Sequence, residues 1–73
     1  MTYTEFKTKW ETEILPNKPT FIREGQALIN YLGDVWMNEY ERINNTENDC
    51  FHRNSLIPKT WKHLEKVWNN YPN

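Results

Sequence analysis

Large apolar side chains recur three and four residues apart at both ends of this 73-residue chain, and this spacing is the feature that most limits its fold. The series near the start is Tyr3, Phe6, Trp10 and Ile14, and the series near the end is Ile57, Trp61, Leu64, Trp68 and Tyr71. At about 100° per residue, each series falls on one stripe of an α-helix. We therefore predict an amphipathic helix at each end.

Local signals place the ends of the first helix. Thr2 stands three residues ahead of Glu5, in the capping-box arrangement that satisfies free backbone N–H groups at a helix N-terminus. Pro16 and Pro19 are expected to stop the helix and to form a short, stiff connection. The first helix is therefore predicted over residues 2–15.

The middle of the chain is its most apolar part. Apolar residues at helical spacing continue over residues 21–43, after a candidate N-cap at Thr20. Gly33 and Asp34 interrupt this pattern, either as a tolerated glycine within one helix or as the end of one helix and the N-cap of the next. We favour one helix over residues 20–43, straight or bent.

A polar segment separates this helix from the last one. Residues 44–49 read Asn-Asn-Thr-Glu-Asn-Asp, and their short polar side chains favour a turn or an exposed loop. The apolar pair Cys50 and Phe51 is expected to fold back onto the core. Pro58 suits the first turn of a helix over residues 56–70, which Pro72 would end.

These elements predict a single all-α domain over residues 1–73, built from three helices. A chain this short buries only about 60% of the surface that its unfolded form exposes, so one core is the most it can build. Gly25 lies on the apolar face of the middle helix, where it would let another helix approach closely. The predicted core contains Phe6, Trp10, Leu28, Leu32, Trp36, Trp61, Leu64 and Trp68.

Charge is nearly balanced overall but unevenly distributed. Nine basic and ten acidic residues give a net charge of −1, which argues against the uniformly basic surface of a nucleic-acid packaging protein. Residues 25–52 hold one basic and five acidic residues, a net charge of −4, whereas residues 53–73 hold four basic residues and one acidic residue, a net charge of +3. This polarity either guides a partner or lets the two parts attract each other.

The cysteine content and the apolar runs bear on the compartment. Cys50 is the single cysteine, so no intramolecular disulfide can form, and a reducing compartment is expected. No apolar run reaches the roughly 18–20 residues needed to cross a membrane, and the first residues lack the cationic and apolar regions of a secretory signal. We expect a soluble, cytoplasmic protein.

The residues with catalytic or metal-binding chemistry lie close together in the sequence. Asp49, Cys50 and His52, with His63 further on, are of metal-ligand types, but structural zinc sites use two spaced pairs of ligands. A Cys50 nucleophile activated by His52 or His63 would need a substrate pocket for which so short a chain has little room. We therefore expect no metal, no cofactor and no enzymatic activity.

Glu39 is the main exception to the amphipathic pattern of the middle helix. Helical projection places its carboxylate among apolar residues such as Leu32 and Ile43, and a buried carboxylate needs a partner. One interpretation is that the helix turns before Glu39, or that its head group reaches solvent. The other is that Arg53, a lysine or a partner protein pairs with it.

The expected function is binding to another protein. The apolar content exceeds what three short helices easily hide, so self-association is also expected, with Tyr31, Trp36, Met37 and Tyr40 as its exposed members. The candidate partner-binding residues are Trp36, Glu39, Tyr40, Glu41, Glu47 and Asp49. The alternative is weak nucleic-acid binding through a basic stripe on the last helix, made of Arg53, Lys59, Lys62 and Lys66.

Four segments carry a resemblance to a group of proteins. They are residues 23–32 (REGQALINYL), 49–51 (DCF), 57–58 (IP) and 64–68 (LEKVW). Over roughly the last two thirds of the chain, their order resembles small uncharacterised proteins encoded by bacteriophages and prophages, although His52 and Arg53 depart from the more acidic loop of that group. The resemblance implies a phage accessory protein, made in the bacterial cytoplasm, that occupies a host protein such as defence or restriction machinery.

Overall fold

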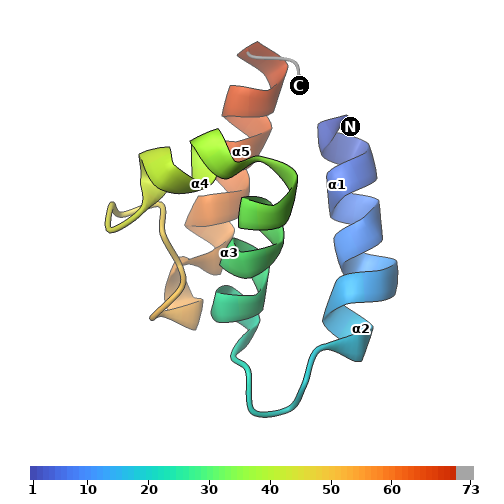
Figure 1. Cartoon of the computed structure of the whole chain (residues 1–73). Helices are drawn as coiled ribbons and strands as arrows, with labels where there is room; N and C mark the ends of the chain where they lie inside the picture. Colours follow the sequence, from blue (N-terminus) through green and yellow to red (C-terminus); the bar gives the residue numbers. More distant parts are fainter. Residues whose placement is uncertain (71–73) are drawn as a thin grey trace.

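The N-terminal part of the chain forms one helical rod, as the spacing of its apolar residues predicts. The computed structural model describes residues 1–70, with only the backbone of Asn70. In it, α1 (Tyr3–Lys9), the π-helical turn η1 (Trp10–Ile14) and α2 (Leu15–Asn17) follow one another without interruption (Figure 1). The predicted capping box begins the rod, because Thr2 Oγ1 accepts from the Glu5 N–H at 3.1 Å and Glu5 Oε1 accepts from the Thr2 N–H at 2.8 Å.

Pro16 does not stop this rod, contrary to the prediction. Helical backbone continues through it to the end of α2, and extended backbone at Lys18 then leads into Pro19. Directly before Pro16 the rod widens into η1, in which the Leu15 N–H bonds the carbonyl of Trp10, five residues back. In a regular α-helix a proline ring collides with the carbonyl four residues earlier, and we attribute the wider turn to this conflict.

The middle segment forms two helices, where one over residues 20–43 was predicted. They are α3 (Glu24–Val35) and α4 (Met37–Ile43), and the chain turns between them at Trp36, with φ −146° and ψ 76°. Gly33 lies inside α3 and does not end it. The turn lets the Trp36 ring pack edge-on against Trp68 of the last helix, with centroids 4.9 Å apart. A tertiary contact therefore overrides the continuous helical pattern.

The start of α3 also differs from the prediction. The Ile22 N–H bonds the Pro19 carbonyl at 3.1 Å, so residues 19–22 form a tight turn, and Thr20 is not the N-cap. Helical backbone begins only after Arg23, whose side chain makes no capping hydrogen bond. This α2–α3 connection, residues 18–23, joins the rod to α3.

The polar segment forms a loop, as predicted, and the last helix follows it. This α4–α5 loop, residues 44–53, leads through the short 3-10 turn η2 (Asn54–Leu56) into α5 (Ile57–Asn70). The start of α5 is one residue from the predicted position. Tyr71 and Pro72, which were expected to extend the apolar seam and to end the helix, lie outside the described residues.

The core is an aromatic cluster between the rod, α3 and α5. The Phe6 ring stacks on Tyr31 with centroids 4.3 Å apart and lies 4.8 Å from Trp68. Six of the eight predicted core residues are buried in the core, and the other two, Trp36 and Trp61, are partly buried and pack against it. The rod stands beside α3, while α5 passes behind (Figure 1).

Gly25 does permit a close approach, but from a loop and not from a helix. A Cβ atom at this position would lie 2.1 Å from the backbone oxygen of Cys50. Cys50 is fully buried, and its thiol donates to the Gly25 carbonyl at 3.5 Å. The predicted return of Cys50 and Phe51 to the core is therefore confirmed, and Gly25 is the residue that makes room for it.

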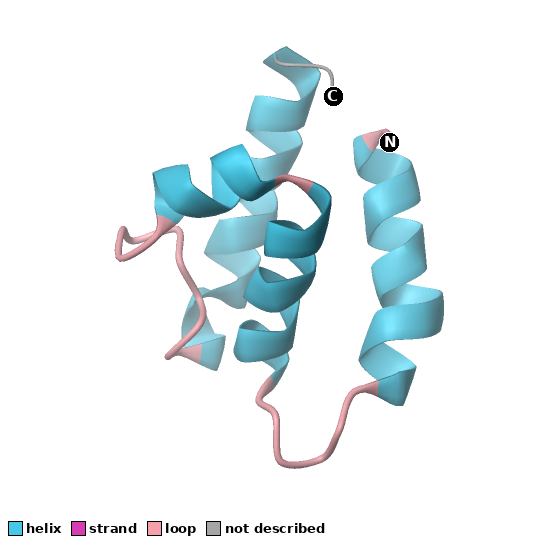
Figure 2. Ribbon diagram, viewed as in Figure 1, coloured by secondary structure: helices cyan, strands magenta, loops and turns pink. Residues whose placement is uncertain are grey.

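The domain is all-α over the part of the chain that the structure describes. Residues 1–70 contain helices, turns and loops and no strand (Figure 2). None of the helices within residues 1–70 combines the length and the apolar character that crossing a membrane requires.

Candidate protein-binding surface

The structure does not gather the predicted partner-binding residues into one exposed patch. Glu39 is completely buried, which excludes it from direct contact with a partner on the folded surface. Trp36 and Tyr40 are partly buried and pack on the core. Of the acidic residues, Glu41 and Glu47 are exposed. The sixth predicted residue, Asp49, is partly buried.

Glu39 instead forms the centre of a buried polar cluster. The carboxylate accepts from Arg42 at 3.0 Å and lies 2.7 Å from His63 Nε2. Its partners are therefore Arg42 and His63, and not Arg53 or a lysine as one interpretation held. The helix does turn before this residue, at Trp36, but the turn directs α4 so that Glu39 meets α5, and the carboxylate does not reach solvent as the first interpretation held.

The neighbouring amide indicates where the imidazole proton lies. Asn48 Nδ2 is 3.3 Å from His63 Nδ1, and an amide nitrogen can only donate. Nδ1 of a neutral His63 is then the acceptor, and Nε2 carries the proton that is donated to Glu39. The cluster joins α4, the α4–α5 loop and α5, and each of its buried polar atoms has a partner.

Asp49 has a structural role within the α4–α5 loop. Its two carboxylate oxygens accept from the backbone N–H groups of Asn45 at 2.9 Å and Phe51 at 3.0 Å. Asn45 adopts the left-handed conformation, with φ 64°, which asparagine tolerates better than most residues. Asp49 also lines a small hollow of about 170 Å³ together with Tyr40 and His52. The structure thus brings Asp49 together with Tyr40 in this hollow, and with Glu47 in a second hollow of the same loop.

The predicted basic stripe is exposed, and part of it is already paired. Arg53, Lys59, Lys62 and Lys66 all face solvent. Lys59 Nζ lies 3.2 Å from Glu47 Oε2, so an ion pair links the acidic loop to the basic helix. The opposite charges of the two segments therefore attract each other within the molecule, at least in this pair.

Cys50 is held as a buried thiol. Burial is the largest cause that raises the pKa of the Cys50 thiol above its ordinary value. The thiol therefore stays protonated at neutral pH. The loop also separates Cys50 from His52, which was considered as its activating base, because Cys50 is buried while His52 is exposed. No three of the Asp, Glu, Cys and His side chains among residues 1–70 are placed to hold a metal ion.

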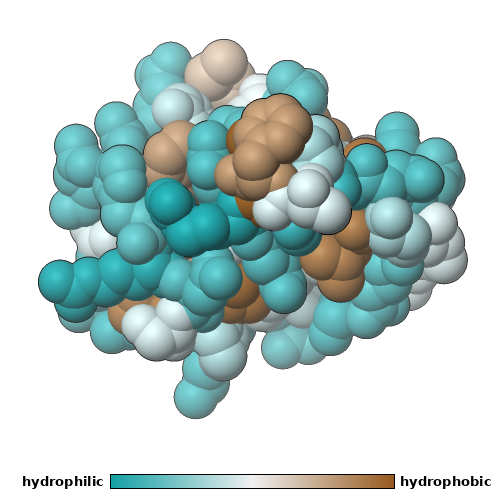
Figure 3. Space-filling model, turned by 90° about the horizontal axis from the view of Figure 1, so that it is seen from below, coloured by the Kyte–Doolittle hydropathy of each residue, from teal (hydrophilic) through white to brown (hydrophobic). Residues whose placement is uncertain are grey.

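Phe21 is the most exposed large apolar residue described, at 82%. It occupies a central position in the turn over residues 19–22. Lys18 Nζ donates to the Ile22 carbonyl at 2.7 Å, a second hydrogen bond across the same turn. The end of the molecule that carries this connection shows hydrophobic side chains among a largely hydrophilic surface (Figure 3). An aromatic side chain is thus held outward on a fixed turn.

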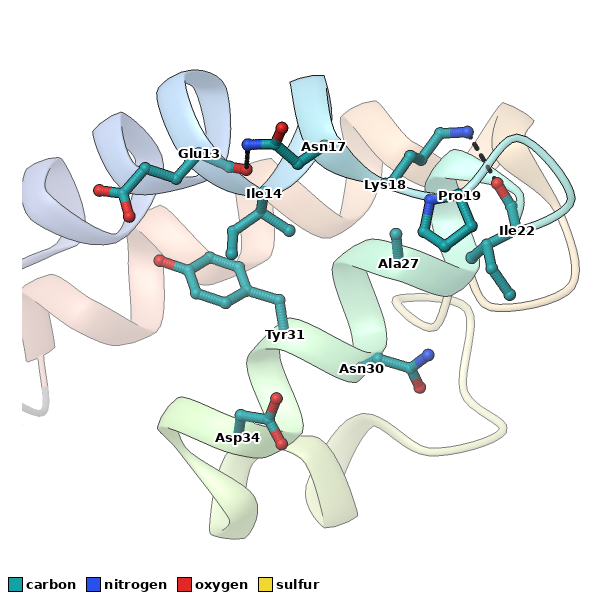
Figure 4. A pocket seen from close by; sticks show the side chains of 10 residues that line it. All are labelled: Glu13, Ile14, Asn17, Lys18, Pro19, Ile22, Ala27, Asn30, Tyr31 and Asp34. Carbon is teal, nitrogen blue, oxygen red and sulfur yellow. Dashed lines mark hydrogen bonds between the residues drawn. The ribbon is translucent and has the colours of Figure 1, made fainter.

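An apolar groove lies next to this turn, between the rod and α3. Its volume is about 350 Å³, and its floor consists mainly of Ile14, Pro19, Ile22, Ala27 and Tyr31. In the close view, Lys18, Pro19 and Ile22 lie at one end, and Glu13 and Tyr31 lie toward the other (Figure 4). Both Phe21 and this groove therefore belong to the surface around the α2–α3 connection.

Sequence reasoning missed this surface because it placed Phe21 on the buried face of a helix. The signal that was present is Pro19, since a proline followed by Thr20 suits a turn at least as well as a helix start. Phe21 lies seven residues before Leu28, which is a helical spacing, although the chain between them is not helical throughout. The hydrogen bond that closes the turn could not be read from the pattern.

Comparison with known proteins adds no assignment: no protein-family model, curated protein or solved structure matches this chain.

Proposed function

We propose that this domain works by binding another protein and that Phe21 is its main anchor. The observation that supports this most directly is the 82% exposure of Phe21, whereas every other aromatic residue described is at least partly buried. Burying a phenylalanine side chain is worth roughly 1.5–3 kcal/mol. Aromatic anchors of this kind often supply most of the energy of a protein interface.

The turn that carries Phe21 favours such a role. Hydrogen bonds from the Ile22 N–H and from Lys18 Nζ hold the turn, and Pro19 restricts its backbone. An anchor that is already ordered loses less conformational entropy when it binds. The adjacent groove offers a complementary feature, since it could receive an apolar side chain of the partner.

Exposed residues of α4 supply a second contact area. Met37 is 54% exposed and stands one helical turn before Glu41, which is also exposed, so both lie on one side of α4. Together with Glu47 they offer an apolar and acidic contact for a basic partner surface. This contact retains part of the acidic set predicted from the sequence, without the buried Glu39.

We further propose that the partner is a protein of a bacterial host. This part rests on the resemblance of the sequence to small phage and prophage proteins, which implies action in the bacterial cytoplasm on a host protein such as defence machinery. In this proposal the domain is not an enzyme and acts by occupying its partner.

Affinity capture from a nuclease-treated bacterial lysate tests the proposal. The bait is the full chain, compared with Phe21→Ala and with Thr20→Ala, a neighbouring exposed residue of the same turn. We expect the wild type and Thr20→Ala to retain the same protein, and Phe21→Ala to lose it by about tenfold or more. Equal capture by all three baits would refute the role of Phe21.

The nucleic-acid alternative predicts a different pattern. Its basis is the exposure of Lys62 and Lys66, which form no ion pair among residues 1–70. Binding through phosphates would weaken steeply with salt, and replacing Lys59, Lys62 and Lys66 would reduce the salt dependence by nearly one unit per lost contact. Captured material that nuclease removes, and that depends on these lysines and not on Phe21, would favour this alternative.

A further inference from the structure

The groove beside the α2–α3 connection combines apolar and acidic side chains, and this combination limits what can bind in it. Its floor is apolar and includes Ile14 from η1 and Tyr31 from α3. Two carboxylates stand on opposite walls, Glu13 on the rod and Asp34 on α3 (Figure 4). Lys18 is the one cation of the lining, and it lies at one end of the groove with its Nζ 2.7 Å from the Ile22 carbonyl oxygen. Such a groove fits an apolar side chain that has a positive charge next to it.

The two carboxylates have no cationic partner among the described residues. Neither Glu13 nor Asp34 takes part in an ion pair with any residue from 1 to 70. Glu13 and Tyr31 line the same groove, and burial and then the charge of Glu13 raise the pKa of Tyr31. Positive charge brought to this place would therefore be stabilised.

The same chain presents an anchor with the matching chemistry. Phe21 projects from the turn, with Lys18 three residues before it and Arg23 two residues after it. Within residues 1–70 these two cations bond backbone carbonyls and form no ion pair, Lys18 bonding that of Ile22 at 2.7 Å and Arg23 that of Phe51 at 2.9 Å. An aromatic residue flanked by two cations that have no carboxylate partner within residues 1–70 complements an apolar groove with two carboxylates.

We propose that the groove is filled by Phe21 of a second copy of this chain, in a symmetric dimer to which each copy contributes one anchor and one groove. The proposal rests on the proposed function, because it uses the same anchor. The anchor and the groove lie side by side on one surface. Two copies related by a two-fold axis can therefore place each anchor in the groove of the other copy, and both contacts form in one closed dimer. The cations beside each Phe21 then approach Glu13 and Asp34 of the other copy.

Overall charge and size are compatible with this arrangement. The net charge of −1 puts little general repulsion between two copies. An interface at the lower limit for stable association buries about 1,200 Å² in total, or roughly 600 Å² per copy. That is a small part of the 4793 Å² surface of one copy, and the groove, the turn and the neighbouring charged residues occupy one end of the molecule.

Sedimentation equilibrium of the full chain over low to high micromolar concentration tests the proposal. We expect the mass to rise with concentration from 9.0 kDa toward twice that value. Phe21→Ala should raise the dimer Kd at least about tenfold, and Thr20→Ala should leave it unchanged. A wild type that keeps the mass of one chain at high micromolar concentration, or a Phe21→Ala variant that associates like the wild type, overturns the proposal.

Two further variants test the groove itself. Asn30→Trp places a large side chain on an exposed wall position, so it should block the groove without disturbing the core. Replacing Glu13 with Gln and Asp34 with Asn should weaken association, with the larger effect at low salt. Dimerisation of Asn30→Trp at the wild-type Kd would show that the groove is not the receptor.

The outcomes separate this inference from the proposed function. A monomeric wild type that nevertheless captures a foreign protein through Phe21 rejects the dimer and keeps the proposed function. A dimer that depends on Phe21 and captures no foreign protein keeps the dimer and rejects the foreign partner. If both hold, the amount of partner captured per bait molecule should fall as the bait concentration rises through the dimer Kd with the partner in excess, since partner and second copy compete for one anchor.

Discussion

Glu39 and His63 explain at the level of single residues how a carboxylate can lie in the core of so small a domain. Removing a charge from water is costly unless the charge is paired and hydrogen-bonded. Here one carboxylate oxygen accepts from Arg42 and the other from His63, and Asn48 in turn fixes the imidazole. The sequence shows the anomaly at Glu39, but it does not identify a partner that lies 24 residues away.

The His63→Ala substitution should therefore be strongly destabilising. It leaves the buried carboxylate with only Arg42, and breaking such a pair costs about 3 kcal/mol or more. Arg42→Ala is the matched control, because the Arg42 side chain is 57% exposed and water can replace it. Urea unfolding measures both variants. An Arg42→Ala variant as unstable as His63→Ala would show that the His63 contact has no special weight.

Stability should also fall at alkaline pH. Burial raises the pKa of Cys50 from 9.0, and burial is also the largest cause that raises the pKa values of Tyr3 and Tyr31 from 10.0. The unfolded chain then loses these protons first, so the stabilisation present at neutral pH declines as the pH rises through these values. Urea midpoints up to about pH 11 would show this decline. Cys50→Ala should remove the part that begins near 9.0 and keep the later part, whereas a flat profile would contradict the argument.

At the level of elements, periodicity and caps predict the outer helices well and the middle one poorly. The rod and α5 each have one apolar stripe with local start signals, so their positions follow from nearest neighbours in sequence. The break at Trp36 depends on a contact with Trp68, and the start of α3 depends on the turn closed at Pro19. The first cause lies 32 residues away in the sequence, between Trp36 and Trp68, whereas the second is local. Pro19 and Thr20 suit a helix start as well as a turn, and the exposed anchor Phe21 was missed for this reason.

The two glycines of α3 should respond to alanine in opposite ways. At Gly25 the added methyl group would meet the Cys50 backbone oxygen at 2.1 Å, so the α4–α5 loop must shift and the domain should lose stability. At Gly33 the nearest atom belongs to Tyr40 at 3.5 Å, an ordinary contact, and alanine should stabilise the helix by about 0.5–1 kcal/mol. Thermal unfolding followed by circular dichroism compares the two. Equal effects at both positions would contradict the close approach at Gly25.

At the level of the whole molecule, one core serves all helices, and the proposed binding surface lies outside it. Leu64 is completely buried against the aromatic cluster, whereas Phe21 adds nothing to this cluster. The fold class and the core residues were therefore predictable, because one amphipathic pattern defines both. The binding surface was not predictable, because the position of a side chain that faces solvent does not follow from the apolar pattern of the core.

Two truncations should separate folding from binding. Leu64→Ala should lose about 2–5 kcal/mol, which is most of the stability of a small domain. Phe21→Ala should stay within about 0.5 kcal/mol of the wild type when measured as a monomer. Urea denaturation at low micromolar concentration gives both values. A large loss in Phe21→Ala would mean that this residue supports the fold and would remove the reason for regarding it as an anchor.

The aromatic cluster also determines what can be observed by fluorescence. Trp36 and Trp68 lie 4.9 Å apart, and Trp10 and Trp61 lie 6.2 Å apart, so all four indoles of the chain belong to close pairs in one core. Their emission responds to loss of the core as a unit. The α4–α5 loop contains no tryptophan, so opening of this loop alone would leave the signal nearly unchanged and would need hydrogen exchange to be detected.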